Sequence, residues 1–268
     1  MPAINLAILK TQAARLAENF SEPQVFVRAL NGLLDHYTNR TIRAAQTAQR
    51  LSLPTYHTPA PVLRQILSEM ASLPDSKPGE AVALTETLWD AGTLESRLLA
   101  TSLLGRIPLT HALHLIARLP DWLVESTDKK VRTALLTDGF TRLRRENPEA
   151  LFILLEDWLK SPRPATQVWG LQALIPILKD PHFENLPAIF RIVRPAFLSA
   201  GPLTQVDLQT CLATLEQVSL TETLAFLRDI TRGYPPALML RTLRRILPGL
   251  SPEMQTGLLD ILREKGTK

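Results

Sequence analysis

The segment from Leu88 to Ala100 constrains the fold more than any other, because part of its pattern returns about seventy residues later. In both places a tryptophan (Trp89 and Trp158) lies near the end of a helical stretch, a short break follows, and the next stretch carries apolar residues three or four positions apart. A helical hairpin of this kind cannot bury its apolar face alone and must pack against neighbouring copies. The pattern predicts a helical-repeat solenoid.

The rest of the chain favours an all-α fold. Ser21, Asn147, Ser161 and Ser251 each stand just before or near a proline, as is typical of helix starts. β-Branched residues do not cluster and no alternating run ends in a hairpin signal. Helical periodicity between these boundaries predicts helices over residues 3–18, 22–37, 40–51, 60–72, 78–91, 94–107, 109–119, 128–146, 148–160, 164–179, 184–199, 204–218, 221–232, 236–247 and 252–264.

The tryptophans also recur with a repeat-like period. Trp89, Trp122 and Trp158 are separated by 33 and 36 residues, which is within the range of paired-helix repeats. We therefore expect a curved stack of antiparallel helix pairs, similar to HEAT-like repeats, forming a single domain over residues 1–268. An irregular helical bundle is the alternative. In either fold, five leucines with helical spacing are predicted to be buried: Leu98, Leu103, Leu171, Leu174 and Leu243.

Composition excludes some classes of protein and leaves others open. With 45% hydrophobic residues the chain can bury a sizeable core, yet no apolar run approaches the roughly twenty residues of a membrane helix. The single cysteine, Cys211, has apolar neighbours and is expected to be buried, which fits a reducing cytoplasm. A net charge of +4 permits a nucleic-acid partner without requiring one. We expect a cytoplasmic protein with no membrane association.

Several segments, in order and spacing, resemble the bacterial DNA alkylation repair (AlkD-like) family of HEAT-like glycosylases. They are Tyr56 and Pro59 with residues 61–66, then residues 88–100, then residues 155–178, and the resemblance covers about residues 25–230. It implies a curved solenoid whose concave basic face holds duplex DNA. Active members hydrolyse the N-glycosidic bond of alkylated, cationic bases with tryptophans against the lesion, an aspartate near the sugar and an arginine on the backbone. The resemblance implies no metal and no cofactor.

The residues matching the family's active site depart from its pattern. Trp122 matches a lesion-contacting tryptophan, but Ser126 stands where the aspartate is expected, and Asp128 fits only with a small insertion. Glu125 is an alternative carboxylate. Val168 occupies the position of the arginine, and its neighbour Trp169 cannot clamp a phosphate. The family's later tryptophan has no clear counterpart. We therefore expect excision of 3-methyladenine or 7-methylguanine to be weak or absent.

Trp122 and Asp128 are the candidate catalytic residues, since an aromatic ring attracts a cation and a carboxylate stabilises the charge that develops on the sugar. The alternative interpretation makes Trp122 a core residue and Asp128 an acid at a helix start. The candidate DNA-binding residues are Lys129, Lys130, Arg132, Arg163 and Trp169, and we expect the four basic ones to share a surface, although a solvated charged face is also typical of such a run.

Other charged residues receive ordinary structural roles. The groups Arg142, Arg144, Arg145 and Arg241, Arg244, Arg245 suit helix C-termini electrostatically. Arg97 is expected to pair with Asp90 or Glu95. His111 and His114 lack further ligands, so no metal site is predicted.

Two functions therefore stay open. The first is a monomeric protein that binds duplex DNA and resembles the repair glycosylases, with an incomplete set of catalytic residues. The second is a non-catalytic scaffold that binds a protein or peptide in its groove.

Overall fold

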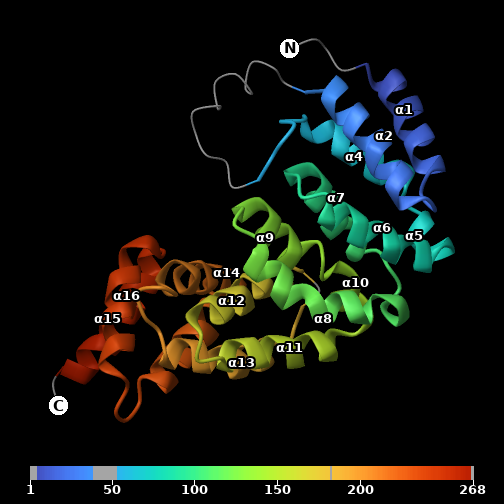
Figure 1. Cartoon of the computed structure of the whole chain (residues 1–268). Helices are drawn as coiled ribbons and strands as arrows, with labels where there is room; N and C mark the ends of the chain where they lie inside the picture. The colour runs from blue at the N-terminus through green and yellow to red at the C-terminus, as the bar shows by residue number, and fades with distance from the viewer. Residues whose placement is uncertain (1–4, 39–52, 182, 267–268) are drawn as a thin grey trace. The chain divides into compact units, whose positions relative to one another are not determined.

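The computed structural model describes residues 5–38, 53–181 and 183–266. Every regular element in these ranges is a helix, which confirms the all-α prediction (Figure 1). No helix in them combines the length and apolar character needed to cross a membrane. The helix predicted over 40–51 lies outside the described residues. The chain divides into two compact units, Met1–Asn147 and Pro148–Lys268, and the single domain expected over 1–268 stays a prediction.

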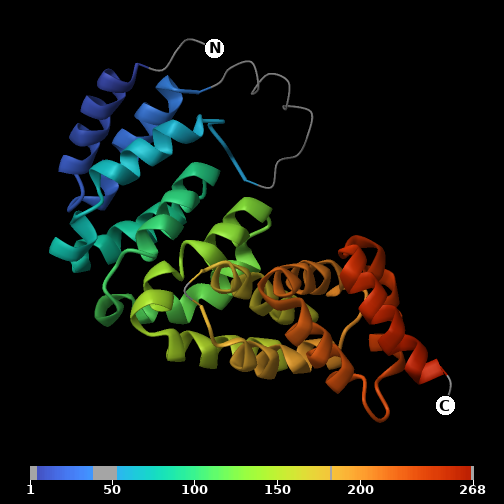
Figure 2. The same ribbon diagram turned by 180° about the vertical axis from the view of Figure 1, so that it is seen from behind.

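The first unit runs from blue to green in Figures 1 and 2. Two rows of helices build it. In one row α4 packs on α7 and α7 on α9, while in the other α2 packs on α6 and α6 on α8; the contacts α6–α7 and α8–α9 join the rows. The helices are α1 (Leu6–Glu18), α2 (Pro23–His36), α4 (Ala60–Glu69), α5 (Leu73–Ser76), α6 (Pro78–Asp90), α7 (Leu94–Leu104), α8 (Leu109–Glu125), α9 (Lys129–Thr137) and α10 (Thr141–Glu146).

The second unit repeats this two-row packing. One row joins α11 to α13, the other joins α12 to α14, and α11–α12 and α13–α14 contacts connect them; α15 and α16 pack on α14. Its helices are α11 (Pro148–Lys160), α12 (Pro164–Leu178), α13 (Leu186–Leu198), α14 (Gln205–Ile230), α15 (Ala237–Ile246) and α16 (Pro252–Gly266), with a short 3₁₀ turn, η1 (Leu247–Gly249).

The helix predicted over 128–146 is wrong as one element, because α9 and α10 are separate helices. A close approach explains the break. A Cβ atom on Gly105, at the end of α7, would lie 1.9 Å from the carbonyl oxygen of Asp138, between the two helices. Only a glycine allows the backbone after α9 to come this near to α7. The contact lies at the end of α9.

The two helices predicted over 204–218 and 221–232 are joined as α14, with one non-helical residue between them. Ser219 has extended backbone angles, φ −157° and ψ 104°, and its hydroxyl accepts a hydrogen bond from the backbone N–H of Glu222 at 3.3 Å. This is the geometry of a helix start, in which a serine side chain satisfies a free N–H group. The predicted boundary is therefore present as a kink.

The predicted core residues are buried, with one exception. Leu103, Leu171, Leu174 and Leu243 have at most 1% of their surface exposed. Leu98 is only half-buried, so its prediction is wrong. The buried residues of α7 are at positions 95, 96, 99, 100, 101, 103 and 104. Residue 98 lies at the edge of the side that most of them share, since each residue turns a helix by about 100°.

Candidate nucleic-acid interface

Trp122 packs in the core of the first unit. Its indole ring stacks on that of Trp89, with centroids 4.3 Å apart and planes 10° apart, and both side chains are at most 2% exposed. The Trp89 Nε1–H donates to Glu125 Oε2 at 3.2 Å. Trp122 thus joins α8 to α6, as the core interpretation expected, and the role of Trp122 in catalysis stays a prediction.

Arginines lie over both rings of this stack. The guanidinium carbon of Arg97 is 4.5 Å from the centroid of Trp89, and that of Arg118 is 5.6 Å from the centroid of Trp122. Arg118 also forms an ion pair with Glu86 at 2.8 Å. Cations above indole faces are attracted by the ring quadrupole. The two tryptophan rings therefore do bind cations, and these cations are side chains of the same protein, Arg97 and Arg118.

The ion pair expected between Arg97 and Asp90 or Glu95 is absent among the described residues. Glu95 instead accepts hydrogen bonds from the Thr55 hydroxyl at 2.8 Å and from the Tyr56 backbone N–H at 3.1 Å. Nε and Nη1 of Arg97 are buried without a hydrogen-bond partner in that part of the chain. Glu95 holds the segment before α4, and Arg97 contacts the ring of Trp89.

Asp128 is the N-cap residue of α9. Its Oδ1 accepts hydrogen bonds from the backbone N–H groups of Lys130 at 2.7 Å and Val131 at 3.4 Å. A capping carboxylate of this kind also interacts favourably with the positive end of the helix. Asp128 therefore caps α9, as its helix-start interpretation expected. Its role in catalysis stays a prediction.

The loop before α9 is held by Arg132. Its Nη1 donates to the carbonyl oxygens of Ser126 at 2.9 Å and Thr127 at 3.3 Å. Ser126, at the position of the family's aspartate, is buried. Arg132 is half-buried and part of its guanidinium is already occupied, so it is less available to a ligand than the lysines beside it.

A hollow of about 580 Å³ lies along α9. Lys129 and Lys130 are exposed there, and neither has an ion pair within the described ranges. The hollow brings together Asp128 and both lysines with polar and small side chains of α9, and Arg132 does not line it. Its lining residues are Asp128, Lys129, Lys130, Thr133, Ala134, Thr137 and Asp138.

The other two candidate DNA-binding residues belong to the second unit. Arg163 is exposed at the start of α12. Trp169 is half-buried and meets Trp158 edge to face, with centroids 5.9 Å apart and planes at 70°. Val168 is also half-buried. That Arg163 shares a surface with Lys129, Lys130 and Arg132 stays a prediction, because these residues belong to different units.

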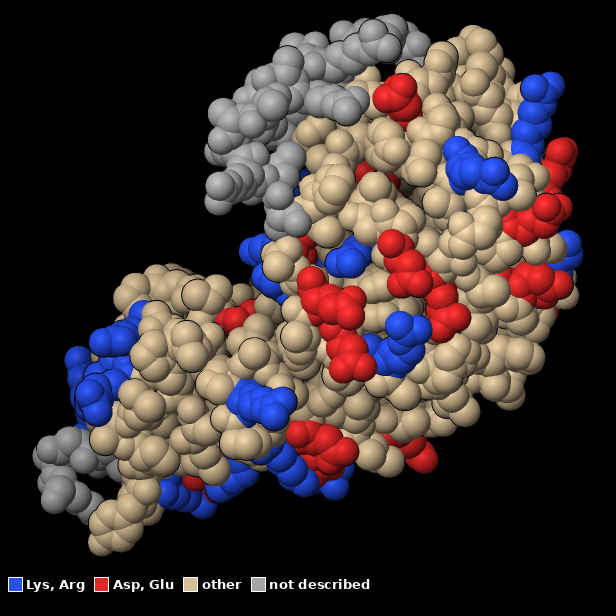
Figure 3. Space-filling model, in the orientation of Figure 1, with Lys and Arg blue, Asp and Glu red and all other residues tan. Residues whose placement is uncertain are grey.

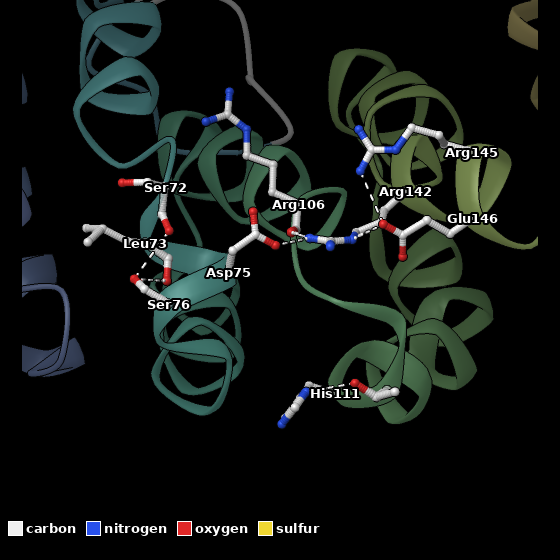
Figure 4. A network of polar contacts seen from close by, with 10 residues as sticks. Ser72, Leu73, Asp75, Ser76, Arg106, His111, Arg142, Arg145 and Glu146 are labelled. Carbon is white, nitrogen blue, oxygen red and sulfur yellow. Dashed lines mark hydrogen bonds and ion pairs between the residues drawn. The ribbon is translucent and has the colours of Figure 1, made fainter.

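Arg142 makes a bridge that its local sequence does not suggest (Figure 4). Nη1 donates to Asp75 Oδ1 and to the carbonyl oxygen of Arg106, and Nε donates to Glu146 Oε1, each at 2.6 Å. Partial burial opposes the charge, but the hydrogen bonds to Asp75 and Glu146 outweigh it and raise the pKa of Arg142. This arginine ties α10 to the α5 segment and to the turn after α7.

Two further candidates for chemistry have little support. Burial raises the pKa of the Cys211 thiol to about 12, so the nucleophilic thiolate is scarce at neutral pH. His114 Nε2 lies 3.8 Å from Glu86, and His111 Nδ1 contacts the hydroxyl of Thr110 at 3.0 Å. In the ranges that the structure describes, no three or more His, Cys, Asp or Glu side chains gather as a metal site.

Trp122 was a candidate by itself in the sequence, and its stacking on Trp89 was not predicted. The signal was the spacing of 33 residues, which places the two rings near the ends of neighbouring helices of one row. The contacts of Arg97 and Glu125 with Trp89 had no comparable signal.

Comparison with known proteins identifies a matching family. The family model described as DNA alkylation repair enzyme matches residues 32–242. No curated protein and no solved structure is significantly similar to the chain. The match covers well over half of the residues, so the chain belongs to the DNA alkylation repair enzyme family.

Proposed function

We propose that the chain is a HEAT-like helical solenoid that binds duplex DNA, with weak or absent base excision. Membership of the repair family and the two rows of helices in each unit support the solenoid. The observation that carries DNA binding is the hollow on α9, where Lys129 and Lys130 face solvent without an acidic partner among the described residues. Such lysines are suited to neutralise backbone phosphates.

The lysine side chains carry more of this binding than the helix terminus does. A helix start can grip a phosphate through its free N–H groups. Here the Asp128 carboxylate already accepts hydrogen bonds from two of them. The carboxylate also repels a phosphate close to the cap. Phosphate binding at α9 therefore depends on the ammonium groups of Lys129 and Lys130.

The surroundings of the candidate catalytic groups argue for weak chemistry. Trp122 is buried, Glu125 accepts a hydrogen bond from Trp89, and Asp128 is engaged as a cap. Val168, at the position of the family's arginine, offers no charge for the DNA backbone. Losing one stabilising group typically lowers the rate by about a hundred- to a thousandfold. Losing both the acid and the arginine lowers the rate further.

Duplex binding measured across salt concentrations tests the proposal. For a protein that neutralises Z phosphates, log affinity falls with log salt with a slope of about −0.9Z. Replacing Lys129, Lys130 and Arg163 together by glutamine is expected to flatten the slope by about two to three units on that basis. Arg132 is left in place because it holds the loop before α9.

A matched control removes three charges elsewhere. Lys10, Arg15 and Arg28 are exposed on α1 and α2, and their replacement by glutamine changes net charge equally. This control is expected to leave most of the slope intact. Absence of measurable binding by the unaltered chain at low salt would overturn the proposal and favour a scaffold for proteins or peptides.

A further inference from the structure

α15 has two chemically distinct faces. Met239, Thr242, Leu243 and Ile246 are buried against the second unit, with at most 3% of their surface exposed. Arg241, Arg244 and Arg245 are all exposed. Positions three and four apart lie on the same side of a helix, so these guanidinium groups share one face. We call these three residues the arginine face.

No acid neutralises the arginine face among the described residues. None of its three side chains has an ion pair or hydrogen bond there. Figure 3 shows Lys and Arg side chains gathered over the α15–α16 end of the second unit. Three like charges held on adjacent turns repel one another, and an anionic partner would relieve this repulsion.

The chemistry of this face selects among anionic partners. A membrane-surface helix inserts its apolar side, but that side of α15 is buried in the second unit. A protein interface has an apolar, often aromatic centre, whereas Leu238, 45% exposed, is the large apolar side chain that α15 exposes. Interfaces with nucleic acids are polar and strongly positive, and arginine forks bind phosphate oxygens in pairs.

We propose that the arginine face of α15 is a second contact surface for the phosphate backbone of DNA, on a different unit from the α9 hollow. The inference rests on the proposed function, that the chain binds DNA. Arg244 and Arg245 lie beyond residue 242, where the family match ends, so membership of the family does not assign them a role. The contacts are to phosphates and carry no base specificity.

The test replaces Arg241, Arg244 and Arg245 by glutamine and measures duplex binding across salt concentrations. With about 0.9 unit of slope per neutralised phosphate, the slope is expected to flatten by about two to three units, and affinity near 0.1 M salt to fall on the order of a hundredfold. Replacing the same residues by lysine keeps the charge and is expected to retain most of the slope. Far-UV circular dichroism verifies that both variants fold.

Controls separate failure of this inference from failure of the proposed function. The matched control is again Lys10, Arg15 and Arg28 changed to glutamine. If the unaltered chain does not bind duplex DNA, the proposed function fails and this inference with it. If the variant with Lys129, Lys130 and Arg163 replaced loses slope but the arginine-face variant behaves like the matched control, only the inference is overturned. Loss of binding to phosphatidylserine vesicles with unchanged DNA binding would also overturn it, in favour of a membrane surface.

Discussion

Trp89 and Trp122 stack face to face although 33 residues separate them, with their ring centroids 4.3 Å apart. One tryptophan is in the last turn of α6 and the other in the last turn of α8, and these two helices pack side by side. The spacing of 33 residues in the sequence thus corresponds to a physical contact between two neighbouring helices of one row. Burial of both rings gives the contact its energy, and the cation above each ring adds to it.

Truncating Trp122 is expected to destabilise the fold. Trp122→Ala removes a fully buried ring, which typically costs about 3–5 kcal/mol in the free energy of unfolding. Chemical denaturation measures this, and a double-mutant cycle with Trp89→Ala is expected to give a coupling of about 0.5–1.5 kcal/mol. A change in stability under about 0.5 kcal/mol, together with loss of binding to alkylated DNA, would instead identify Trp122 as a ligand contact.

Replacing each of two glycines by alanine is expected to change stability in opposite directions. Gly105→Ala would place a Cβ atom 1.9 Å from a backbone oxygen, so the contact between α7 and the end of α9 must open. Gly32, inside α2, has nothing within 4 Å of an added Cβ. Gly32→Ala is expected to stabilise by roughly 0.5–1 kcal/mol through helix propensity, and Gly105→Ala to destabilise by several kcal/mol. Equal effects of the two changes in thermal unfolding would contradict the close approach.

The buried thiol makes a stability prediction with a definite sign. Burial raises the Cys211 pKa from 9.0 to about 12, so above pH 9 the unfolded chain loses this proton while the folded chain keeps it. Stability from this group is therefore constant below about pH 9 and declines as pH rises toward 12. Cys211→Ala removes the decline, which appears as a difference in slope between the two proteins in urea unfolding at several pH values. Parallel slopes would show that the thiol titrates normally.

Local signals predicted most helices because prolines and capping side chains act within one turn. The starts of α11 and α12 at Pro148 and Pro164 match the predicted starts. The break between α9 and α10 has a local signal, Gly139 just after the end of α9, and it also involves the close approach of Gly105 from another helix, which no local pattern indicates.

The contacts of the candidate site also divide into local ones, which the sequence predicted, and long-range ones, which it did not. The cap by Asp128 is local, and its helix-start interpretation followed from the residue type. The bridge from Arg142 to Asp75 joins residues 67 positions apart, and the Arg97 contact depends on the packing of α6 against α7. Side-chain partners of this kind follow from the fold and are invisible in a single sequence.

Two substitutions of Asp128 distinguish a role in base excision from its role as a helix cap. Asn caps a helix about as well as Asp, so Asp128→Asn is expected to keep stability within about 0.5 kcal/mol, whereas Asp128→Ala is expected to lose about 1 kcal/mol. Release of 3-methyladenine or 7-methylguanine from alkylated duplex DNA is expected to be weak or absent in the unaltered chain. Any residual release that depends on the carboxylate is expected to fall in both variants, while duplex binding is retained in both.

The outcomes of that assay are distinct. Robust release by the unaltered chain would contradict the proposal of weak excision. If release is measurable and Asp128→Asn leaves it unchanged, Asp128 acts only as the cap of α9, and Glu125→Gln becomes the next test because Glu125 is the remaining carboxylate beside the tryptophan stack. Loss of release in Asp128→Asn with unchanged stability would assign the carboxylate a role in the chemistry, since the cap itself is preserved.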